Sequence, residues 1–517
     1  MKSKKGRVEN LLIIILSVLI VGSIGWTVYR KTKAPKVELQ DAKLVLYDGP
    51  KSLQDATAED LESTSETQRD FTLKHCVDTQ ITVDGEDCYV YDTNVNHTRK
   101  WVSNYLPPIA RTPITYFDFE GRADLVITVP DKDIENVKIS PVSYGIEPVV
   151  DKEAHTVSFS ITTPDTYTVT FNDSPDRAVH IFANPIETDV PDFNDENVVY
   201  VGPGEWDIDS IVLESGQTLY ISGGAVIHGV VNSDYVKDVK VCGRGIIDGS
   251  KMEGWKGTMA YIPLKFDHSS DVTIKDVIVL NANAWVCQAF DSENGVIDGV
   301  KIISARPNGD GITIQSCRNY DIKNCFVRTW DDSLVVKNYS TNSENITFSK
   351  MQLWTDLAQS MEVGYETNKG AKEDAAITGI TFQDICVLNN FHKPVISVHN
   401  ADDATVSDIN FRNVTVENAQ MGSGDGDEAP YLIDLNIPKT SNWSTTKERG
   451  QIKNVTIENV TVLSGRDLAS RISGFDETHL VDGVTIKNLT VLGKKITDFN
   501  EGKFEINEDT TKNLTIE

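Results

Sequence analysis

Apolar and polar residues alternate with a period of two through most of the chain, a pattern typical of β-strands with one buried face. In the second half one phrase recurs: apolar, any, apolar, any, Asp/Asn/Gly/Lys, apolar, as in Val272–Val277 and Tyr320–Cys325. The central apolar residues of its copies, 23 to 46 residues apart, are Ile274, Ile297, Ile322, Phe348, Phe382, Phe411, Ile457 and Ile486. A base period in the low twenties with variable insertions predicts a solenoid, and such short β-rich phrases make it a right-handed parallel β-helix.

Long insertions between the copies must be loops on the outside, because each coil buries its inward face only against its neighbours. We expect the longest insertion, between Phe411 and Ile457, to border a groove. It contains Gly422–Asp427, for which a flexible acidic loop and a calcium site are alternatives.

The first part of the chain has a different pattern. In His155–Ile161 every second residue is apolar, and Tyr167, Val169 and Phe171 continue the pattern after a Pro-Asp turn. Strands of period two bounded by Pro, Asp and Gly predict an antiparallel sandwich. The expected organisation is therefore an all-β chain with an N-terminal segment at 1–36, a β-sandwich at 37–195 and a β-helix at 196–517.

Residues Leu11 to Tyr29 form a nearly unbroken apolar run without charge, flanked by Lys and Arg on both sides. About 20 such residues span a bilayer. No Ala-x-Ala cleavage site follows, which favours an uncleaved transmembrane signal anchor over a signal peptide. We expect a cell-membrane protein with its remaining domains outside the cell.

Acidic residues outnumber basic ones by 77 to 49, giving a net charge of −28. This balance argues against nucleic acid and anionic membrane surfaces as partners, and makes a highly acidic polymer an awkward substrate. The seven cysteines form no Cys-x-x-Cys pair, so no metal or cofactor is expected, although Cys76 and Cys88 are candidates for one disulfide in an oxidising compartment. The sequence does not indicate an oligomeric state.

Three aspartates are the candidate catalytic residues. Asp310 lies in Asn-Gly-Asp-Gly, and the pair Asp331-Asp332 follows 21 residues later, close to one minimal coil. Neighbouring coils stack about 4.8 Å apart, so the three carboxylates should be close together. Grouped carboxylates repel, one retains its proton as a general acid, and the others polarise water. Alternatively, these are turn residues in polar loops, and spacing alone does not decide between the two interpretations.

The motifs around these aspartates carry a family resemblance. Asn308–Gly311 with Asp331-Asp332 resembles the Asn-Thr-Asp-Gly and Asp-Asp motifs of the polygalacturonases (glycoside hydrolase family 28), and Gly243–Gly249 with Trp255 is similar to an early segment of that fold. The segments Asp331–Ser340, Leu353-Trp354 and Met361–Glu366 look closer to the dextranase and isopullulanase family (glycoside hydrolase family 49). That family also has a β-sandwich before its β-helix. The resemblance covers roughly residues 197–420 in sequence.

The resemblance implies a role for each aspartate: Asp331 as general acid, with Asp310 and Asp332 activating a water and inverting the anomeric carbon. It places Lys337 near the groove, where a solvated strand residue is the alternative. The other expected substrate-binding residues are Trp285, Trp330, Trp354 and Tyr365, whose rings could face sugars or anchor the core, together with Gln359 and Glu362.

The chain departs from the polygalacturonases at two motifs, because neither Gly-His-Gly nor Arg-Ile-Lys occurs. Gln359 stands roughly in place of the histidine, and Val395–His399 roughly in place of the basic pair. A galacturonate carboxylate therefore lacks an obvious partner. We expect an inverting hydrolase of a neutral α-linked polysaccharide, foremost an α-glucan such as dextran. The alternatives are a pectin hydrolase of polygalacturonase type and a non-catalytic surface β-helix that binds glycan.

Overall fold

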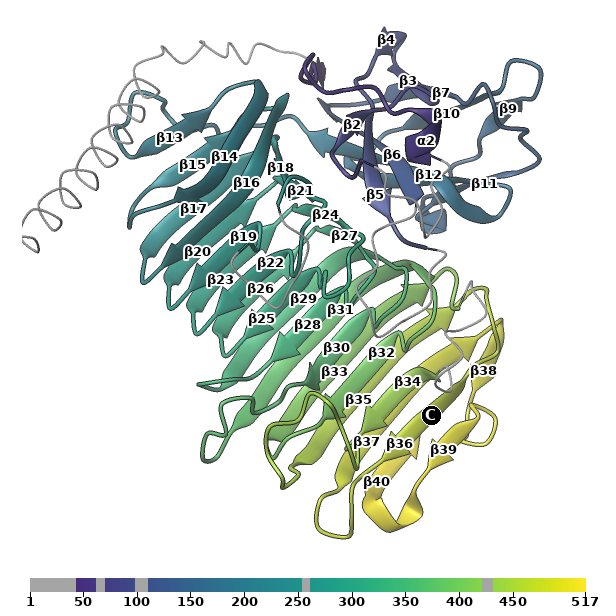
Figure 1. Cartoon of the computed structure of the whole chain (residues 1–517). Helices are drawn as coiled ribbons and strands as arrows, with labels where there is room; N and C mark the ends of the chain where they lie inside the picture. Colours follow the sequence, from purple (N-terminus) through teal and green to yellow (C-terminus); the bar gives the residue numbers. More distant parts are fainter. Residues whose placement is uncertain (1–42, 62–69, 98–109, 253–260, 421–430) are drawn as a thin grey trace, which may run out of the picture.

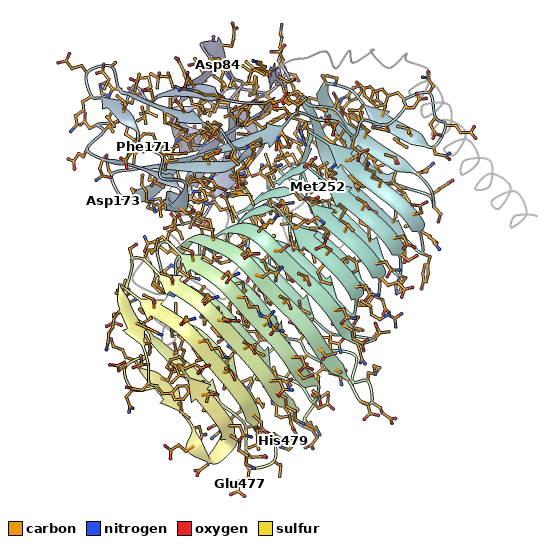
Figure 2. The ribbon with its side chains drawn as sticks, turned by 180° about the vertical axis from the view of Figure 1, so that it is seen from behind. Asp84, Phe171, Asp173, Met252, Glu477 and His479 are labelled. Atoms are coloured by element: carbon orange, nitrogen blue, oxygen red, sulfur yellow. The ribbon has the colours of Figure 1, made fainter. Side chains whose placement is uncertain are left out.

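The computed structural model describes residues 43–61, 70–97, 110–252, 261–420 and 431–517. These residues form a small β-sandwich that lies against one flank of a long solenoid (Figure 1). Viewed from behind, Phe171 marks the sandwich, while His479 lies at the opposite, C-terminal end of the solenoid (Figure 2). The all-β prediction is confirmed for this part of the chain.

The sandwich consists of two sheets with a shared apolar core. Alternation brings Val157, Phe159 and Ile161 into that core, together with Val169 and Phe171. One pairing differs from the expected antiparallel arrangement, since β12 runs parallel to β6. The strands of the larger sheet are β1 (Leu44–Leu46), β2 (Lys74–His75), β5 (Tyr91–Val95), β6 (Ala110–Phe119), β8 (Val137–Ser140), β11 (Asp165–Phe171) and β12 (Ser174–Pro185). Those of the smaller sheet are β3 (Gln80–Val83), β4 (Glu86–Asp87), β7 (Ala123–Thr128), β9 (Val149–Asp151) and β10 (Thr156–Ile161), and the short helices are α2 (Ala58–Leu61) and η1 (Val142–Tyr144).

The solenoid is a single sheet of 28 strands in which each strand pairs in parallel with its counterpart one coil later, except for the antiparallel pair β37–β38. Its strands up to β26 are β13 (Val198–Val201), β14 (Gly204–Val212), β15 (Thr218–Ile221), β16 (Ala225–Asp234), β17 (Lys237–Gly243), β18 (Ile246–Asp248), β19 (Leu264–Asp267), β20 (Ser270–Lys275), β21 (Ile278–Leu280), β22 (Cys287–Phe290), β23 (Glu293–Asp298), β24 (Lys301–Ser304), β25 (Ile312–Gln315) and β26 (Arg318–Lys323). The rest are β27 (Phe326–Thr329), β28 (Leu334–Lys337), β29 (Ser343–Thr355), β30 (Met361–Tyr365), β31 (Ala376–Asn390), β32 (Ile396–Asn400), β33 (Thr405–Val416), β34 (Tyr431–Asn436), β35 (Gln451–Val462), β36 (Ala469–Ser473), β37 (Val481–Val491), β38 (Lys494–Ile496), β39 (Phe504–Ile506) and β40 (Thr511–Ile516), with η2 at Glu508–Thr510.

The recurring phrase of the sequence is the repeating unit of this solenoid. All eight central residues of the phrase, from Ile274 to Ile486, pair with one another in one continuous register. Within this column the rings of Phe348, Phe382 and Phe411 stack with centroids 4.9 and 5.0 Å apart. The fifth position of the phrase has a positive φ in every copy, which explains its Asp, Asn and Gly residues. The predicted solenoid of parallel strands is confirmed.

Buried charges join the sandwich to the solenoid. Arg244 of the solenoid contacts Asp118 of the sandwich at 2.8 Å. Arg328 pairs with Asp356 at 3.2 Å, contacts His180 of the sandwich at 3.0 Å, and stacks on the Trp354 ring at 4.4 Å. The two bodies therefore share a desolvated polar interface.

Several features predicted from the sequence fall on residues that the structure does not describe. The proposed anchor at Leu11–Tyr29, the acidic segment Gly422–Asp427 and Trp255 all lie beyond the described residues. Within the described residues, no helix has the length and apolar character needed to cross a membrane. All seven cysteines are free thiols, so Cys76 and Cys88 form no disulfide in this structure.

Candidate active site

The three aspartates lie where loops enter neighbouring parallel strands. Strands β22, β25, β28 and β30 are successive rungs of the solenoid, with Ile312 opposite Leu334 and Leu334 opposite Met361. These residues point into the apolar core, so the side chains that alternate with them, including Lys337, point outward. The loops just before the strands carry the aspartates.

Asp310 is stacked on Asp332 by continuation of the strand ladder. The Gly311 amide donates to the Asp332 carbonyl at 2.8 Å, and the Ile312 amide to the Ser333 carbonyl at 3.0 Å. A side chain at Gly309 or Gly311 would collide with its surroundings: a Cβ at Gly311 would lie 2.5 Å from the Ser333 carbonyl oxygen. The glycines on both sides of Asp310 are therefore required for the close packing of this turn.

Asp331 is held by backbone amides and remains partly exposed. Its Oδ2 accepts a hydrogen bond from the Asn308 amide at 2.8 Å, and its Oδ1 accepts one from the Asp332 amide at 3.1 Å. Asp332 is buried, and its Oδ1 accepts from the Gln359 amide at 2.9 Å. These bonds fix the orientation of both carboxylates: Asp331 faces the Asn308 amide, and Asp332 faces the Gln359 amide.

Lys337 supplies the positive charge of the cluster. Its Nζ lies 3.2 Å from Asp310 Oδ2 and 3.4 Å from Glu366 Oε2, and it stands 4.4 Å from the centre of the Trp285 ring. Although burial disfavours the ammonium, Glu366 and the aspartates outweigh that effect and raise the pKa of Lys337 above its usual range. Lys337 is thus a buried cation and not a solvated strand residue.

Burial raises the pKa of each aspartate. For Asp310 the Lys337 ammonium offsets part of that effect, while Asp331 and Glu366 add to it, and the pKa is raised to about 7. Burial also raises the pKa of Asp331, against the amide of Asn308. The pKa of Asp332 is raised well above its usual range, because burial acts together with the charges of Asp331 and Asp310. The cluster therefore holds at least one proton near neutral pH.

A cavity of about 260 Å³ opens above the three aspartates, and we call it the aspartate cavity. Of the expected site residues it contains Asp310, Asp331, Asp332, Lys337, Trp285, Gln359 and Tyr365. Its other lining residues are Asn308, Leu357, Ala358, Glu366, Lys393, Asn442 and Trp443. The arrangement combines carboxyl groups of different protonation with aromatic faces, as a sugar-cleaving site requires.

Three expected sugar contacts do not reach this cavity. Trp330 and Trp354 are 1% and 0% exposed, so the prediction that they bind sugar is wrong for both. The Trp354 indole instead packs against Arg328 beneath the sandwich and donates to Asp356 Oδ1 at 2.7 Å. Glu362 is 0% exposed as well, and its carboxylate is already occupied by neighbouring side chains, so it is not an acceptor for a sugar hydroxyl.

Glu362 belongs to a row of buried charges that sequence reasoning missed. Its carboxylate accepts from Ser397 and lies 2.9 Å from His399 Nδ1, and His399 Nε2 lies 3.0 Å from Asp434 Oδ2. Arg471 closes the row with bonds of 2.8 and 2.6 Å to Asp434. Burial disfavours the imidazolium, but Glu362 and Asp434 outweigh it and raise the pKa of His399 to about 10. The signal was the polar residues at positions 397 and 399, which alternate with the apolar Ile396 and Val398.

A second cavity of about 610 Å³ adjoins the first, and we call it the C-terminal cavity. Gln359, Tyr365, Asn442 and Trp443 line both. Trp443 belongs to the insertion between Phe411 and Ile457, and residues 436–443 of that insertion line this groove. Trp443 itself was missed, because its surroundings in the sequence show no motif.

A larger cavity of about 710 Å³ lies between the sandwich and the solenoid and contains none of the three aspartates. Its charged groups are largely paired, as in the contact of Arg244 with Asp276 at 2.7 Å. We therefore place the candidate chemistry in the aspartate cavity. Within the described ranges, no group of three or more His, Cys, Asp or Glu side chains is arranged to hold a metal ion.

Comparison with known proteins agrees with the fold. Residues 210–506, more than half of the chain, match the family described as Glycosyl hydrolases family 28. A polygalacturonase of Chamaecyparis obtusa is 29% identical over 129 residues, 22% of this chain and 24% of that protein. A probable endopolygalacturonase D of Neosartorya fischeri is 24% identical over 292 residues, 51% of this chain and 57% of that protein. The chain thus spans less than two thirds of these curated relatives.

Among solved structures, Dex49A from Penicillium minioluteum is similar over 92% of this chain and 99% of its own, with a TM-score of 0.62 and 15% identity. The likeness extends over both the sandwich and the solenoid, so the two-body architecture is shared. At this identity it concerns the fold alone.

Proposed function

Since the chain belongs to the glycosyl hydrolases of family 28, we propose that it is a glycosidase that hydrolyses a neutral α-linked polysaccharide in the aspartate cavity. The observation that supports this most is the contrast among three adjacent carboxyl groups. Asp331 is partly exposed, whereas Asp310 and Asp332 are buried beside it. General acid and base catalysis needs one group that donates a proton and another that accepts one. Carboxyl groups in such different surroundings can take these two roles.

In the proposed reaction Asp331 gives its proton to the glycosidic oxygen as the bond to the anomeric carbon breaks. Asp310, as carboxylate, takes a proton from a water that attacks that carbon from the opposite face, and Asp332 orients the same water. The water oxygen becomes the new anomeric hydroxyl, and the configuration inverts. Lys337 stays charged and favours the ionised form of Asp310.

The preference for a neutral sugar rests on how the groove's cations are paired. Lys337 lies between Asp310 and Glu366, and His399 lies between Glu362 and Asp434. Arg471 is bound by both oxygens of Asp434. A uronic acid carboxylate would have to compete with these internal anions for Lys337, His399 and Arg471. Among neutral polymers we favour an α-glucan such as dextran, because Asp331–Ser340 resembles the dextranase and isopullulanase family.

Hydrolysis of polygalacturonate is the second candidate. The curated relatives are named polygalacturonases, and Arg471 and Lys393 do line the two cavities. A carboxylate on the sugar would reach Arg471 if it displaced Asp434.

A substrate panel separates the two candidates. The protein is incubated with dextran, pullulan, polygalacturonate and a galactan, and new reducing ends are counted, with Asp331→Asn as the inactive control. We expect release from a neutral α-glucan, and proton NMR of the first product should show the inverted anomer. Release from polygalacturonate alone would replace the substrate proposal with the second candidate. No release from any polymer would contradict both.

A further inference from the structure

We propose that Trp443 is a sugar-stacking residue that holds the polysaccharide where it passes from the aspartate cavity into the C-terminal cavity. The inference rests on the proposed function and deepens it, because it assigns the direction of the substrate along the solenoid. It also assigns a residue that determines the preference for long chains over short ones.

The position of Trp443 is the first observation. Its indole lines both cavities, and among the residues that the structure describes only Gln359, Tyr365 and Asn442 do so as well. A chain that starts at the aspartates and extends toward the C-terminal coils must therefore pass this side chain. Among the tryptophans in the described parts of the chain, Trp443 is the only exposed one, at 43%.

The second observation is that the loop carrying Trp443 is fixed. Asp402, which is fully buried, accepts hydrogen bonds at its Oδ1 from the amides of Thr445 and Thr446 at 2.7 and 2.9 Å. The hydroxyls of Ser444 and Thr446 donate to the same oxygen at 3.3 and 3.0 Å. One buried carboxylate thus binds the three residues that follow Trp443.

Asp402 also connects this loop to the catalytic coil. Its Oδ2 accepts from the Asn368 amide at 3.2 Å, two residues after Glu366 of the aspartate cavity. From the other side, the buried Arg449 donates to the carbonyls of Pro438 and Thr446 at 3.0 and 3.1 Å. The loop is therefore closed at both ends by buried charged side chains that bond to its backbone.

A large apolar ring on a fixed loop, exposed between two polar cavities, has no structural role in the core. Because its surroundings are already ordered, a sugar that stacks on it loses little further conformational freedom of the protein. Aromatic faces bind the apolar C–H face of sugars while the hydroxyls reach polar neighbours. The C-terminal cavity supplies such neighbours in Asn436, Ser473 and the Asp434–Arg471 pair.

The ring of Tyr365 completes the passage. It stacks on His399 with centroids 4.2 Å apart and planes inclined by 4°, so the imidazolium supports it from beneath. Trp443 lines the two cavities from its loop, and Tyr365 lines them from the end of β30. The geometry points to a substrate chain held between two aromatic residues on the C-terminal side of the cleavage site.

The test compares Trp443→Ala, Trp443→Phe and the parent on the polymer identified in the substrate panel and on the shortest oligosaccharide that is cleaved. For Trp443→Ala we expect KM for the polymer to rise roughly 2- to 13-fold, the value of an aromatic stacking contact, with a much smaller change on the short substrate. Trp443→Phe keeps a ring and should recover most of the loss. Tyr235→Ala, which removes a ring that is 75% exposed elsewhere on the solenoid, is the matched control.

A second variant tests the fixed loop. Asp402→Asn removes the charge that binds the loop and should raise the polymer KM in the same direction, with circular dichroism reporting whether the solenoid stays folded. Equal polymer KM values for Trp443→Ala and the parent would overturn this inference and leave the proposed function intact. A parent that cleaves none of the polymers would overturn the proposed function and this inference with it.

Discussion

Asp310, Asp331 and Asp332 have the same intrinsic acidity, about pKa 3.9, and acquire different roles from their surroundings. Amides hold Asp331 at the cavity surface, Lys337 is bonded to Asp310, and Asp332 receives the Gln359 amide in a buried position. Substitutions in this cluster should therefore have different effects. Replacing Asp331 should lower the rate, replacing Lys337 should change the pH dependence, and replacing Asp332 should stabilise the fold.

Asp331→Asn should reduce kcat by about 10²- to 10⁴-fold, the usual contribution of a general acid. The amide keeps an oxygen for the Asn308 bond and loses only the longer bond from the Asp332 amide, so the fold should persist. Initial rates on the best polymer check this, with the exposed Asp209→Asn as control. Parent-like rates for Asp331→Asn would remove it from the mechanism.

Lys337→Met should move the acidic limb of the pH–rate profile toward higher pH. Its midpoint should lie roughly one pH unit above that of the parent. In the parent, burial and the neighbouring Asp331 and Glu366 raise the pKa of Asp310 to about 7 even though the Lys337 ammonium lowers it. Without the ammonium nothing offsets burial and the neighbouring carboxylates, and Asp310 loses its proton only at higher pH. Lys369→Met is the control, because Lys369 contacts Glu366 at 3.9 Å and shows no bond to Asp310. An unchanged limb would contradict the proposed role of Asp310.

Asp332→Asn should stabilise the fold by at least about 1 kcal/mol at pH 8, since a tenfold change in an acid dissociation constant corresponds to roughly 1.4 kcal/mol. The pKa of Asp332 is raised in the folded protein, so its ionisation costs stability as pH rises above the unfolded pKa of about 4. At a pH of about 3.5 the carboxyl is largely protonated in both states, and the gain should disappear. Thermal unfolding at both pH values decides this, with Asp321→Asn, a half-exposed carboxylate, as reference.

At the scale of the element, the recurring phrase predicted both the strands and how they pair with one another. Its central residues predicted the register of eight coils, because an inward residue that repeats once per coil can only meet its own counterpart. The phrase did not predict the conformation of the Trp443 loop, which lies between two of its copies. That loop is held by side-chain bonds to backbone groups, which leave no periodic trace in a sequence.

Phe382→Ala should destabilise the solenoid by about 3–5 kcal/mol, because it empties the middle of a stack of three rings. Chemical denaturation checks this. Thr381→Ala, one residue away on the outward side, should cost less than about 1 kcal/mol. Similar losses for the two variants would show that the column is not a core of the solenoid.

At the scale of the whole molecule, sequence reasoning found two β-architectures and the position of the aspartates, but not how the two bodies meet. Trp354 shows why. The sequence marks it as an aromatic beside a catalytic motif, yet a partner far away in the chain, the sandwich with His180, buries it. The apparent absence of cations from the groove has a similar origin, since His399 and Arg471 come together only through the register of β32, β34 and β36.

Arg244→Met should destabilise the two-body interface by about 3–5 kcal/mol, because it leaves Asp118 buried without its partner. Limited proteolysis and thermal unfolding measure this, with the exposed Arg122→Met as control. Adding Asp118→Asn should recover part of the loss, because the buried charge is then gone as well. A double variant as unstable as the single one would show that packing, and not charge, holds the interface.

The closure of the Trp443 loop by Asp402 and Arg449 has an evolutionary consequence. The loop depends on a few buried side chains and leaves the apolar column of the solenoid untouched. Its outer residues are therefore free to diverge while the aspartates and the coils stay the same. Selection for a new sugar would act first on this one exchangeable segment, and grafting the loop of a relative between residues 437 and 450 would be the corresponding route for an engineer.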